Sequence, residues 1–439
     1  MPVYDYSGKM IEPLEYVTPQ MFGAKGDSIT DDTAAFQAAI NASRNVYVPL
    51  GKEYKYIITD TLVCTKIQQI IYGDLANPDW ADHGSIVFKG SNGVLFHFKN
   101  GLQGCANLSI TTDTNTNNTA ILFKKDTDKT NADVSVHNCS IKNFGVAIDH
   151  YGRGLSVKRN VFFDCAIAIK TTLVNEPRWD HSNPTNTELL QTYPTYNGRS
   201  LFVADNRFHS IGNKYLYVIS DDYTSGGTTI KQVLNGAIIS GNMMDMGYGN
   251  IEIEAPMKGC IFSNNEIMRM LTADVLFECS GGASECTFAN NTIRGIVDDN
   301  YPQLNACAKD CFAFNGLEST SFTGNIIENF KQRCIYCYGN FKHNTITGNI
   351  FKNYGFDTSV NQYMRTAFDI PDSEYSVISS NSFDSISNFD GYLIRARNPA
   401  ANVWKHNIFN GNTCVKRDVQ EVLVPTTEGT EDNVVQGVS

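Results

Sequence analysis

The chain has 439 residues and a net charge of −11, and only 18% of its residues are charged. This acidic balance argues against a surface that binds nucleic acid or an anionic membrane. The first residues, MPVYDYSGKM, lack an apolar signal-peptide core, and no segment approaches the roughly 18 apolar residues of a membrane span. We therefore expect no secretory signal, no membrane insertion and no nucleic-acid partner.

Residues 1–20 are expected to form an irregular arm, and residues 21–50 a capping helix followed by the first strand. The segment DDTAAFQAAI predicts the helix, with Thr30 or Asp31 as its N-cap. The first strand is predicted at residues 45–48, NVYV. A short amphipathic helix at this place would cover the exposed end of a stack of strands.

Residues 51–415 carry a repeat: an apolar pair, a polar turn with an asparagine, and a further apolar residue. Residues 250–270, NIEIEAPMKGCIFSNNEIMRM, show one full unit of three short strands separated by turns. Intervals of 22 to 26 residues correspond to one coil, and intervals of 31 to 46 residues to a coil with a surface loop. The pattern predicts an all-β solenoid. The repeated asparagines are Asn107, Asn138, Asn160, Asn206, Asn242, Asn265, Asn291, Asn325, Asn349, Asn381 and Asn407.

The twelve cysteines could form disulfide bonds or bind zinc. Cys307, Cys311, Cys334 and Cys337 have a spacing close to that of zinc sites. Two of them, Cys334 and Cys337, are three residues apart in a predicted strand and should point to opposite faces. Most of the others lie in apolar runs, so we predict small core residues made in a reducing cytoplasm.

One segment has a specific resemblance to a known family. The sequence FGAKGDSITDDTAAFQAAI followed by VYVPLG, within residues 19–51, resembles the N-terminal element of the pectate-lyase-like right-handed β-helix superfamily, especially in bacteriophage tailspikes and capsule depolymerases. The resemblance implies a right-handed parallel β-helix and a homotrimer in the virion tail, made in the host cytoplasm. It also implies a bacterial surface polysaccharide and other phage tail or baseplate proteins as partners.

The fold alone does not define the chemistry, because it hosts lyases, hydrolases and inert adhesins. Polygalacturonase-like hydrolases carry Gly-His-Gly and Arg-Ile-Lys motifs, which are absent here although Asp221-Asp222 is present. The acidic ligands and arginine base of calcium-dependent pectate lyases are not found either. We expect neither a metal nor a cofactor.

The candidate catalytic residues are carboxylates on outward positions of one aligned strand per coil. Counting back from the turn asparagines predicts that Glu254 and Glu278 stack, with Glu252 beside them. Like charges at this spacing raise at least one pKa, which separates a proton donor from a base in glycoside hydrolysis. Asp222 and Asp369 are reserve candidates. The alternative is that these acids only keep the surface soluble or bind a cation.

Insertions at residues 171–200 and 220–235, with further ones beyond, flank the same sheet. Aromatic residues with acids suit sugar rings, whose C–H faces stack while their hydroxyls need hydrogen bonds. Tyr336 and Tyr338 could extend the floor of such a groove. The substrate-binding residues predicted in the insertions are Trp179, Asp180, Tyr193, Tyr196, Asp221, Tyr223 and Tyr301.

The sequence thus favours a tailspike-type protein that binds and hydrolyses a bacterial surface polysaccharide. One alternative is a non-catalytic adhesin or structural spike. Another is a polysaccharide lyase with a tyrosine or histidine base. Residues 416–439 leave the repeat and are expected to form a cap or a strand shared between subunits.

Overall fold

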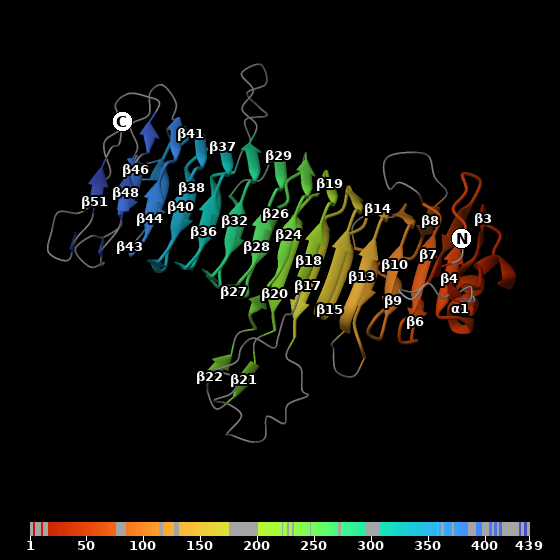
Figure 1. Ribbon diagram of the computed structural model, residues 1–439. Coiled ribbons are helices and arrows are strands. Elements are labelled where there is room, and N and C mark those ends of the chain that lie inside the picture. Colours follow the sequence, from red (N-terminus) through yellow and green to blue (C-terminus); the bar gives the residue numbers. More distant parts are fainter. Residues whose placement is uncertain are drawn as a thin grey trace, which may run out of the picture. The chain divides into compact units, whose positions relative to one another are not determined.

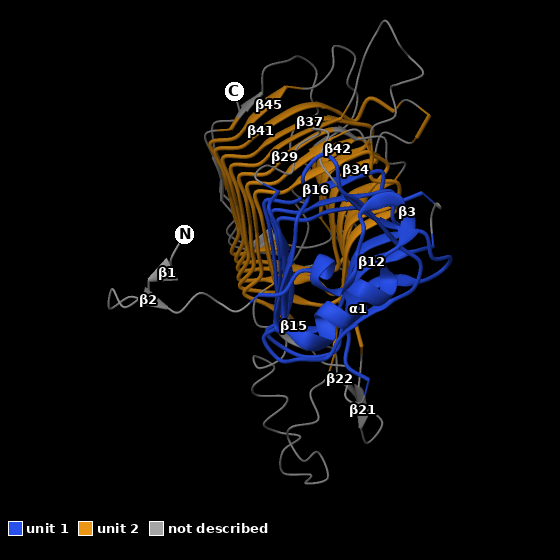
Figure 2. Ribbon diagram, turned by 90° about the vertical axis from the view of Figure 1, so that its right-hand side faces the viewer, with its two compact units in different colours: residues 1–165 blue, residues 166–439 orange. Residues whose placement is uncertain are grey.

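The computed structural model in Figure 1 consists almost entirely of short parallel strands wound into coils, which is a right-handed parallel β-helix. The chain divides into two compact units, residues 1–165 and residues 166–439, which are described separately (Figure 2). The structure describes residues 3–4, 10–11, 16–75, 85–113, 117–126, 131–174, 201–221, 223–225, 228–230, 232–245, 247–270, 274–295, 308–357, 359–360, 364–370, 373–384, 392–396, 404–405, 408–410, 412–414, 430–431 and 434–436.

The first unit begins with a two-stranded pair, β1 (Val3–Tyr4) and β2 (Met10–Ile11), and the short helix η1 (Pro19–Phe22). Its three parallel sheets are built from one strand per coil. The first sheet contains β3 (Asp27–Asp31), β5 (Lys55–Ile58), β8 (Ser85–Phe88), β11 (Ser109–Thr112), β14 (Ser140–Lys142) and β16 (Val161–Phe163). The second contains β4 (Asn45–Val48), β7 (Ile70–Gly73), β10 (Gly104–Ala106), β13 (Asn131–His137) and the long strand β15 (Val146–Lys158). The third contains β6 (Leu62–Cys64), β9 (Val94–Phe98) and β12 (Thr119–Phe123), and β12 also pairs with β15.

Helix α1 (Thr33–Ala42) packs on the first coil of this unit, with Phe36, Ala39 and Ile40 buried. The expected N-cap was Thr30 or Asp31, whereas the N-cap position is Asp32, whose side chain makes no capping hydrogen bond. Asp31 Oδ1 instead accepts from the N–H of Thr33 at 3.0 Å. The strand predicted at residues 45–48 is confirmed as β4, but it is not the first strand, since β3 precedes the helix.

The second unit has four parallel sheets. Most coils contribute one strand to each of them, but the described part of the first coil has no strand in the shortest sheet, and the last described strands belong to only two sheets. The first, called the glutamate sheet, contains β17 (Ile167–Leu173), β20 (Lys214–Ser220), β26 (Asn250–Ile253), β30 (Val275–Cys279), β34 (Asp310–Phe314), β38 (Arg333–Cys337), β42 (Thr366–Ile370) and β46 (Tyr392–Ala396). A short second sheet at the following turn, called the corner sheet, contains β23 (Leu234–Asn235), β27 (Met257–Lys258), β31 (Ala283–Ser284), β35 (Leu317–Glu318), β39 (Phe341–Lys342), β43 (Ser373–Glu374), β47 (Trp404–Lys405) and β50 (Thr430–Glu431).

The two remaining sheets of the second unit complete each coil. The uncharged sheet contains β18 (Leu201–Ala204), β24 (Ile238–Ser240), β28 (Ile261–Ser263), β32 (Thr287–Ala289), β36 (Ser321–Thr323), β40 (Thr345–Thr347), β44 (Val377–Ser379), β48 (Ile408–Asn410) and β51 (Val434–Gln436). The charged sheet contains β19 (Arg207–His209), β25 (Met243–Asp245), β29 (Glu266–Met270), β33 (Thr292–Gly295), β37 (Ile326–Phe330), β41 (Ile350–Tyr354), β45 (Ser382–Asp384) and β49 (Thr413–Cys414). A separate hairpin joins β21 (Tyr223–Ser225) to β22 (Thr228–Ile230).

Inward-facing residues of successive coils form the core of the second unit. Phe288 and Phe322 stack with ring centroids 4.6 Å apart, and Phe277 meets Phe288 edge-on at 5.4 Å. Ten cysteines are described in enough detail to show burial as free thiols, among them Cys334 and Cys337. This confirms that these cysteines are core residues.

Most of the repeated asparagines of the second unit form a buried hydrogen-bonded ladder. Each side-chain Nδ2 donates to the Oδ1 of the asparagine on the next coil, at distances of 2.8 to 3.1 Å. Because a buried amide costs free energy unless it is paired, each coil stabilises the turn of its neighbour. The ladder contains Asn206, Asn242, Asn265, Asn291, Asn325, Asn349, Asn381 and Asn412.

The asparagine series differs from the prediction at its two ends. In the first unit, Asn107 and Asn138 are left-handed corner residues that pair with each other, while Asn160 is bonded to the turn at Cys139. In the second unit the ladder ends with Asn412, and the predicted Asn407 lies outside the described residues. Within residues 416–439, β50 and β51 continue the corner and uncharged sheets.

Candidate functional site

The outward residues of the glutamate sheet form a continuous column, because parallel strands in register bring equivalent positions together at about 4.8 Å. Glu252 on β26 is the direct partner of Glu278 on β30. One residue precedes these two glutamates in the column, and four residues follow them. In order, the column contains Tyr217, Glu252, Glu278, Ala313, Tyr336, Asp369 and Arg395.

The predicted stacking of Glu254 on Glu278 is wrong. Ile251 pairs with Phe277, whereas the prediction aligned it with Val275 and so shifted β30 by two residues. Glu254 lies at the end of β26, where its N–H donates to Val218 O, beside the turn of Ser280. The structure brings the three predicted acids close together, but the direct partner of Glu278 is Glu252 and not Glu254.

Glu252 and Glu278 differ in their surroundings. Glu252 forms an ion pair with Lys214 Nζ, and their side chains are 26% and 18% exposed. Burial is the main cause that raises the pKa of Glu278, and the charges of Glu252 and Asp274 raise it further. One carboxylate is therefore balanced by a cation, while its neighbour holds a proton more readily than an ordinary glutamate.

Glu254 accepts a hydrogen bond of 2.6 Å from the hydroxyl of Tyr217. This bond is the main cause that raises the pKa of Tyr217, together with burial and the charge of Glu252. Tyr217 is therefore held as a neutral phenol, which donates a hydrogen bond and is a poor base. A lyase mechanism that uses Tyr217 as its base is disfavoured by this arrangement.

Asp369 lies away from the glutamates, three strands along the sheet from Glu278. Its side chain is fully buried, and it pairs with Arg333 at 3.1 Å and with Arg395 at 3.4 Å. Arg333 also binds Asp310 at 2.7 Å. Because a buried charge of this kind is compensated by hydrogen-bonded partners, Asp369 belongs to an internal ion-pair network rather than to the exposed acidic pair.

Tyr336 and Tyr338 cover the sheet between the acidic pair and this network. Their ring centroids are 5.6 Å apart, and the guanidinium of Arg333 lies 3.8 Å from the ring centroid of Tyr336. Tyr338 is 37% exposed, and burial followed by the charge of Glu278 raises its pKa. The two rings form an aromatic surface next to the glutamates, with Arg333 holding Tyr336 in place.

The predicted loop residues are mostly outside this description. Asp221 is exposed at the end of β20, and its N–H donates to Leu173 O at 2.9 Å. Tyr223 is on β21, in the hairpin. The predicted residues outside the described part of the chain are Trp179, Asp180, Tyr193, Tyr196, Asp222 and Tyr301. For Tyr223 the structure describes the backbone but not the side chain.

Sequence reasoning missed Lys214, Tyr217 and Arg333. The first two lie in KYLYVIS, whose alternation places Tyr217 outward, but a shift of register between residues 214 and 216 disturbs the spacing. The sequence around Arg333 gives no signal of its two aspartate partners, which are 23 and 36 residues away.

No family model matches the chain. Two curated proteins match short segments. Depolymerase 1 of Klebsiella phage K5-2, described as specific for capsules K30/K69, is 39% identical over 82 residues, which is 19% of this chain and 10% of that protein. A depolymerase of Klebsiella phage K64-1 with the same described specificity is 50% identical over 50 residues, or 11% of this chain and 6% of that protein. The matches thus span a small part of the relatives' length.

Two solved structures share the fold. Tailspike protein 3 of bacteriophage CBA120 aligns with a TM-score of 0.50 and 11% identity, over 96% of this chain and 61% of that one. A mutant of DFA-IIIase from Arthrobacter chlorophenolicus in complex with DFA-III aligns with a TM-score of 0.52 and 11% identity, over 95% and 98% of the two chains. These likenesses establish the fold alone.

The chain is therefore a right-handed parallel β-helix with an acidic pair on one outer face. Its short matches confirm the resemblance to bacteriophage capsule depolymerases, and the structure confirms the right-handed β-helix that this resemblance implied. Within the described part of the chain, no helix is long and apolar enough to cross a membrane.

Proposed function

We propose that the chain is a tailspike-type protein that binds and hydrolyses a bacterial surface polysaccharide. The observation that carries this proposal is the direct pairing of the half-buried Glu252 and Glu278 on the outer face of the glutamate sheet. Lys214 forms an ion pair with Glu252, and the pKa of Glu278 is raised. Paired carboxylates in different environments are the standard requirement of glycoside hydrolysis. The relatives named as capsule depolymerases support capsule as the polysaccharide class.

In the proposed reaction, Glu278 donates its proton to the glycosidic oxygen as the bond to the anomeric carbon breaks. Glu252 attacks that carbon and forms a glycosyl ester, which water hydrolyses while Glu278 takes back a proton. Direct partners on neighbouring strands are about 4.8 Å apart at the backbone, so their carboxyl groups can approach the roughly 5–5.5 Å separation used by retaining enzymes. We therefore propose retention of configuration.

Further proposed contacts to the polysaccharide come from Tyr336 and Tyr338 and from the predicted loops. Asp369 is not proposed as catalytic, because it is buried and paired with two arginines. The loop residues retained in the proposal are Trp179, Asp180, Tyr193, Tyr196, Asp221, Asp222, Tyr223 and Tyr301.

The test is incubation with a panel of purified capsular and O-antigen polysaccharides that includes Klebsiella capsules K30 and K69, followed by fragment analysis. New reducing ends without unsaturation support hydrolysis. A new double bond would indicate a lyase, and binding without fragments a non-catalytic adhesin; either result would refute the proposed reaction.

Residue assignment is tested with Glu278→Gln and Glu252→Gln. Each should lower cleavage by at least about 10²-fold, the lower end for loss of an acid–base group, while binding persists. Glu328→Gln is the matched control, since Glu328 is 24% exposed and paired with Arg294 at 3.2 Å on the charged sheet. Full activity in both active-site variants would refute the assignment.

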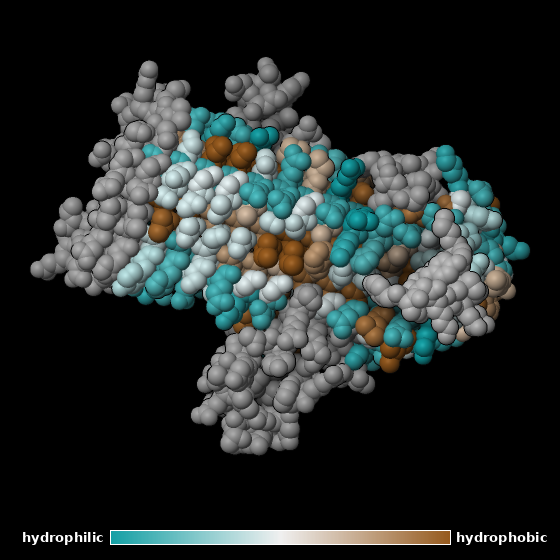
Figure 3. Space-filling model, viewed as in Figure 1, coloured by the Kyte–Doolittle hydropathy of each residue, from teal (hydrophilic) through white to brown (hydrophobic). Residues whose placement is uncertain are grey.

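We also propose a homotrimer in the virion tail that contacts other tail or baseplate proteins. The uncharged sheet supports this assembly, because its described outward positions from β18 to β44 carry no charge (Figure 3). Ile261 on this face is 40% exposed, and a flat face of this kind buries without charge desolvation. Sedimentation should give three times the 48.7 kDa chain mass, and Ser263→Glu should lower it. A monomeric wild type would refute the trimer.

A further inference from the structure

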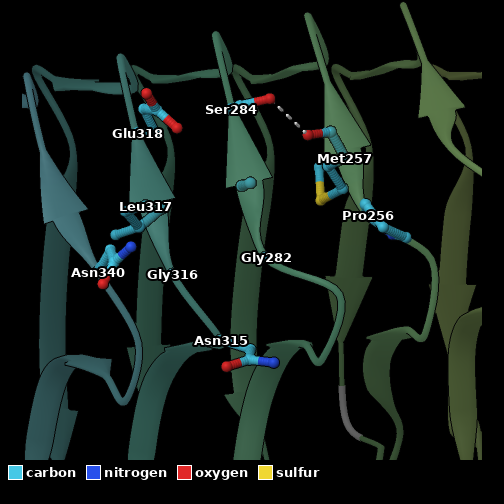
Figure 4. A pocket seen from close by; sticks show the side chains of 10 residues that line it. Pro256, Met257, Gly282, Ser284, Asn315, Gly316, Leu317, Glu318 and Asn340 are labelled. Atoms are coloured by element: carbon cyan, nitrogen blue, oxygen red, sulfur yellow. Dashed lines mark hydrogen bonds between the residues drawn. The ribbon is translucent and has the colours of Figure 1, made fainter. Parts of the chain in front are cut away.

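A pocket of about 230 Å³ lies where the glutamate sheet turns into the corner sheet (Figure 4). Its walls are the turns of successive coils, which follow β26, β30, β34 and β38. The volume is below the range of roughly 300–1,000 Å³ that is usual for drug-sized ligands, so the pocket suits a unit as small as one sugar ring.

Two glycines keep this pocket open. Gly282 and Gly316 have φ angles of +82° and +123°, in the region that side chains rarely adopt. A Cβ on Gly282 would lie 3.2 Å from Asn315 O, so the turn admits no side chain there without a shift. The opening is thus built into the backbone of consecutive coils.

The lining offers both kinds of contact that a sugar needs. The exposed amide side chains of Asn315 and Asn340 make no hydrogen bond to another described residue and can bind hydroxyls. Ser284 adds a hydroxyl, which donates to Met257 O at 3.4 Å (Figure 4). Pro256 supplies an apolar surface for the C–H face of a ring.

The charge of the pocket restricts the sugar. Glu318 is the one charged residue among those that line it. The neighbouring cation in register, Lys342, is already 3.0 Å from Glu374. A carboxylate on the ligand would be repelled by Glu318, so the lining favours an uncharged sugar over a uronic acid.

The pocket lies close to Glu254, which is beside the acidic pair. Asn315 N donates to Cys279 O, which places Asn315 one strand from Ser280 and two strands from Glu254 on the second outward column of the glutamate sheet. At about 4.8 Å per strand, Asn315 is roughly 10 Å from Glu254. One extended polysaccharide chain can contact both.

We infer that this pocket is a subsite for an uncharged sugar residue of the polysaccharide. The inference rests on the proposed function for the identity of the polymer, but its binding chemistry is independent of cleavage. Asn315 and Asn340 bind hydroxyls, Pro256 contacts the ring, and Glu318 excludes acidic sugars.

The experiment is saturation-transfer difference NMR on the full chain with glucose, galactose, mannose, rhamnose and N-acetylglucosamine, and with glucuronic acid as the acidic counterpart. At least one neutral sugar should give a signal in the wild type. Ser284→Trp should reduce it at least fivefold by filling the pocket. Ser382→Trp, a half-buried outward serine on the charged sheet, is the matched control and should leave the signal unchanged.

Absence of signal from every neutral sugar, an unchanged signal in Ser284→Trp, or an equal signal from glucuronic acid would overturn the subsite. The variant Glu278→Gln distinguishes an error in the subsite from an error in the proposed catalytic function. It should retain the sugar signal whether or not the wild type cleaves any polysaccharide.

Discussion

Asn291→Ala tests whether the buried asparagine ladder holds the coils of the second unit together. The carboxamide of Asn291 makes four hydrogen bonds. Its Nδ2 donates to Asn325 Oδ1 at 2.8 Å and to Phe262 O at 2.9 Å. Its Oδ1 accepts from both the backbone N–H and the Nδ2 of Asn265, each at 3.0 Å.

The expected loss follows from the groups that remain. Alanine leaves the two donors of Asn265 buried without an acceptor, at about 1–3 kcal/mol each, so the free energy of unfolding should fall by about 2–6 kcal/mol. That is a large part of the roughly 5–15 kcal/mol of a typical domain. Asn340→Ala is the control, because this exposed asparagine makes no side-chain bond to the described residues and should change stability by less than about 0.5 kcal/mol.

Guanidinium titration followed by far-ultraviolet circular dichroism measures both variants. Where refolding is incomplete, the unfolding rate at a fixed guanidinium concentration takes the place of the midpoint. Equal midpoints or rates for Asn291→Ala and the wild type would show that the ladder is a consequence of the fold and does not stabilise it.

Three further predictions concern the glutamate sheet. Arg333→Ala removes the cation between two buried aspartates and should destabilise the protein by about 3–5 kcal/mol in the same titration; a change below 1 kcal/mol would contradict this. Tyr217→Phe removes the hydrogen bond to Glu254 and should lower kcat about tenfold with little change in thermal stability, whereas unchanged kcat would exclude a positioning role. Because Glu278 must carry its proton, cleavage should decline as pH rises through its raised pKa, and Asp274→Asn should move this decline to lower pH; a move to higher pH would refute the assignment.

The coil period could be predicted because each coil carries the same short turn pattern with an asparagine. An asparagine that is buried at one turn must meet another on the next coil, so Asn242, Asn265 and Asn291 recur whatever lies between them. The N-terminal resemblance added the handedness. Asn107 and Asn138 are turn residues as predicted, with left-handed backbone angles, but they lie one residue before the ladder position, and the sequence pattern did not distinguish these two positions in the turn.

The site was harder to predict because it depends on register between coils. A count of fourteen residues back from Asn265 and Asn291 gives Ile251 and Phe277, and an error of two residues exchanged the partner of Glu278. The burial of Asp369 could not be predicted from the sequence either, since its arginine partners are distant in the chain. Local alternation identifies outward acids, but it does not say what covers them.

The ladder has a consequence for how such a chain can change its target. Ladder bonds span 23, 24 and 26 residues at some steps and 32, 34 and 36 at others, yet the bonded geometry is the same. Extra residues are therefore accommodated without altering the stacking of Glu252 on Glu278. Under the proposed function, exchange of whole insertions would alter which polysaccharide is bound while Glu252 and Glu278 keep their places.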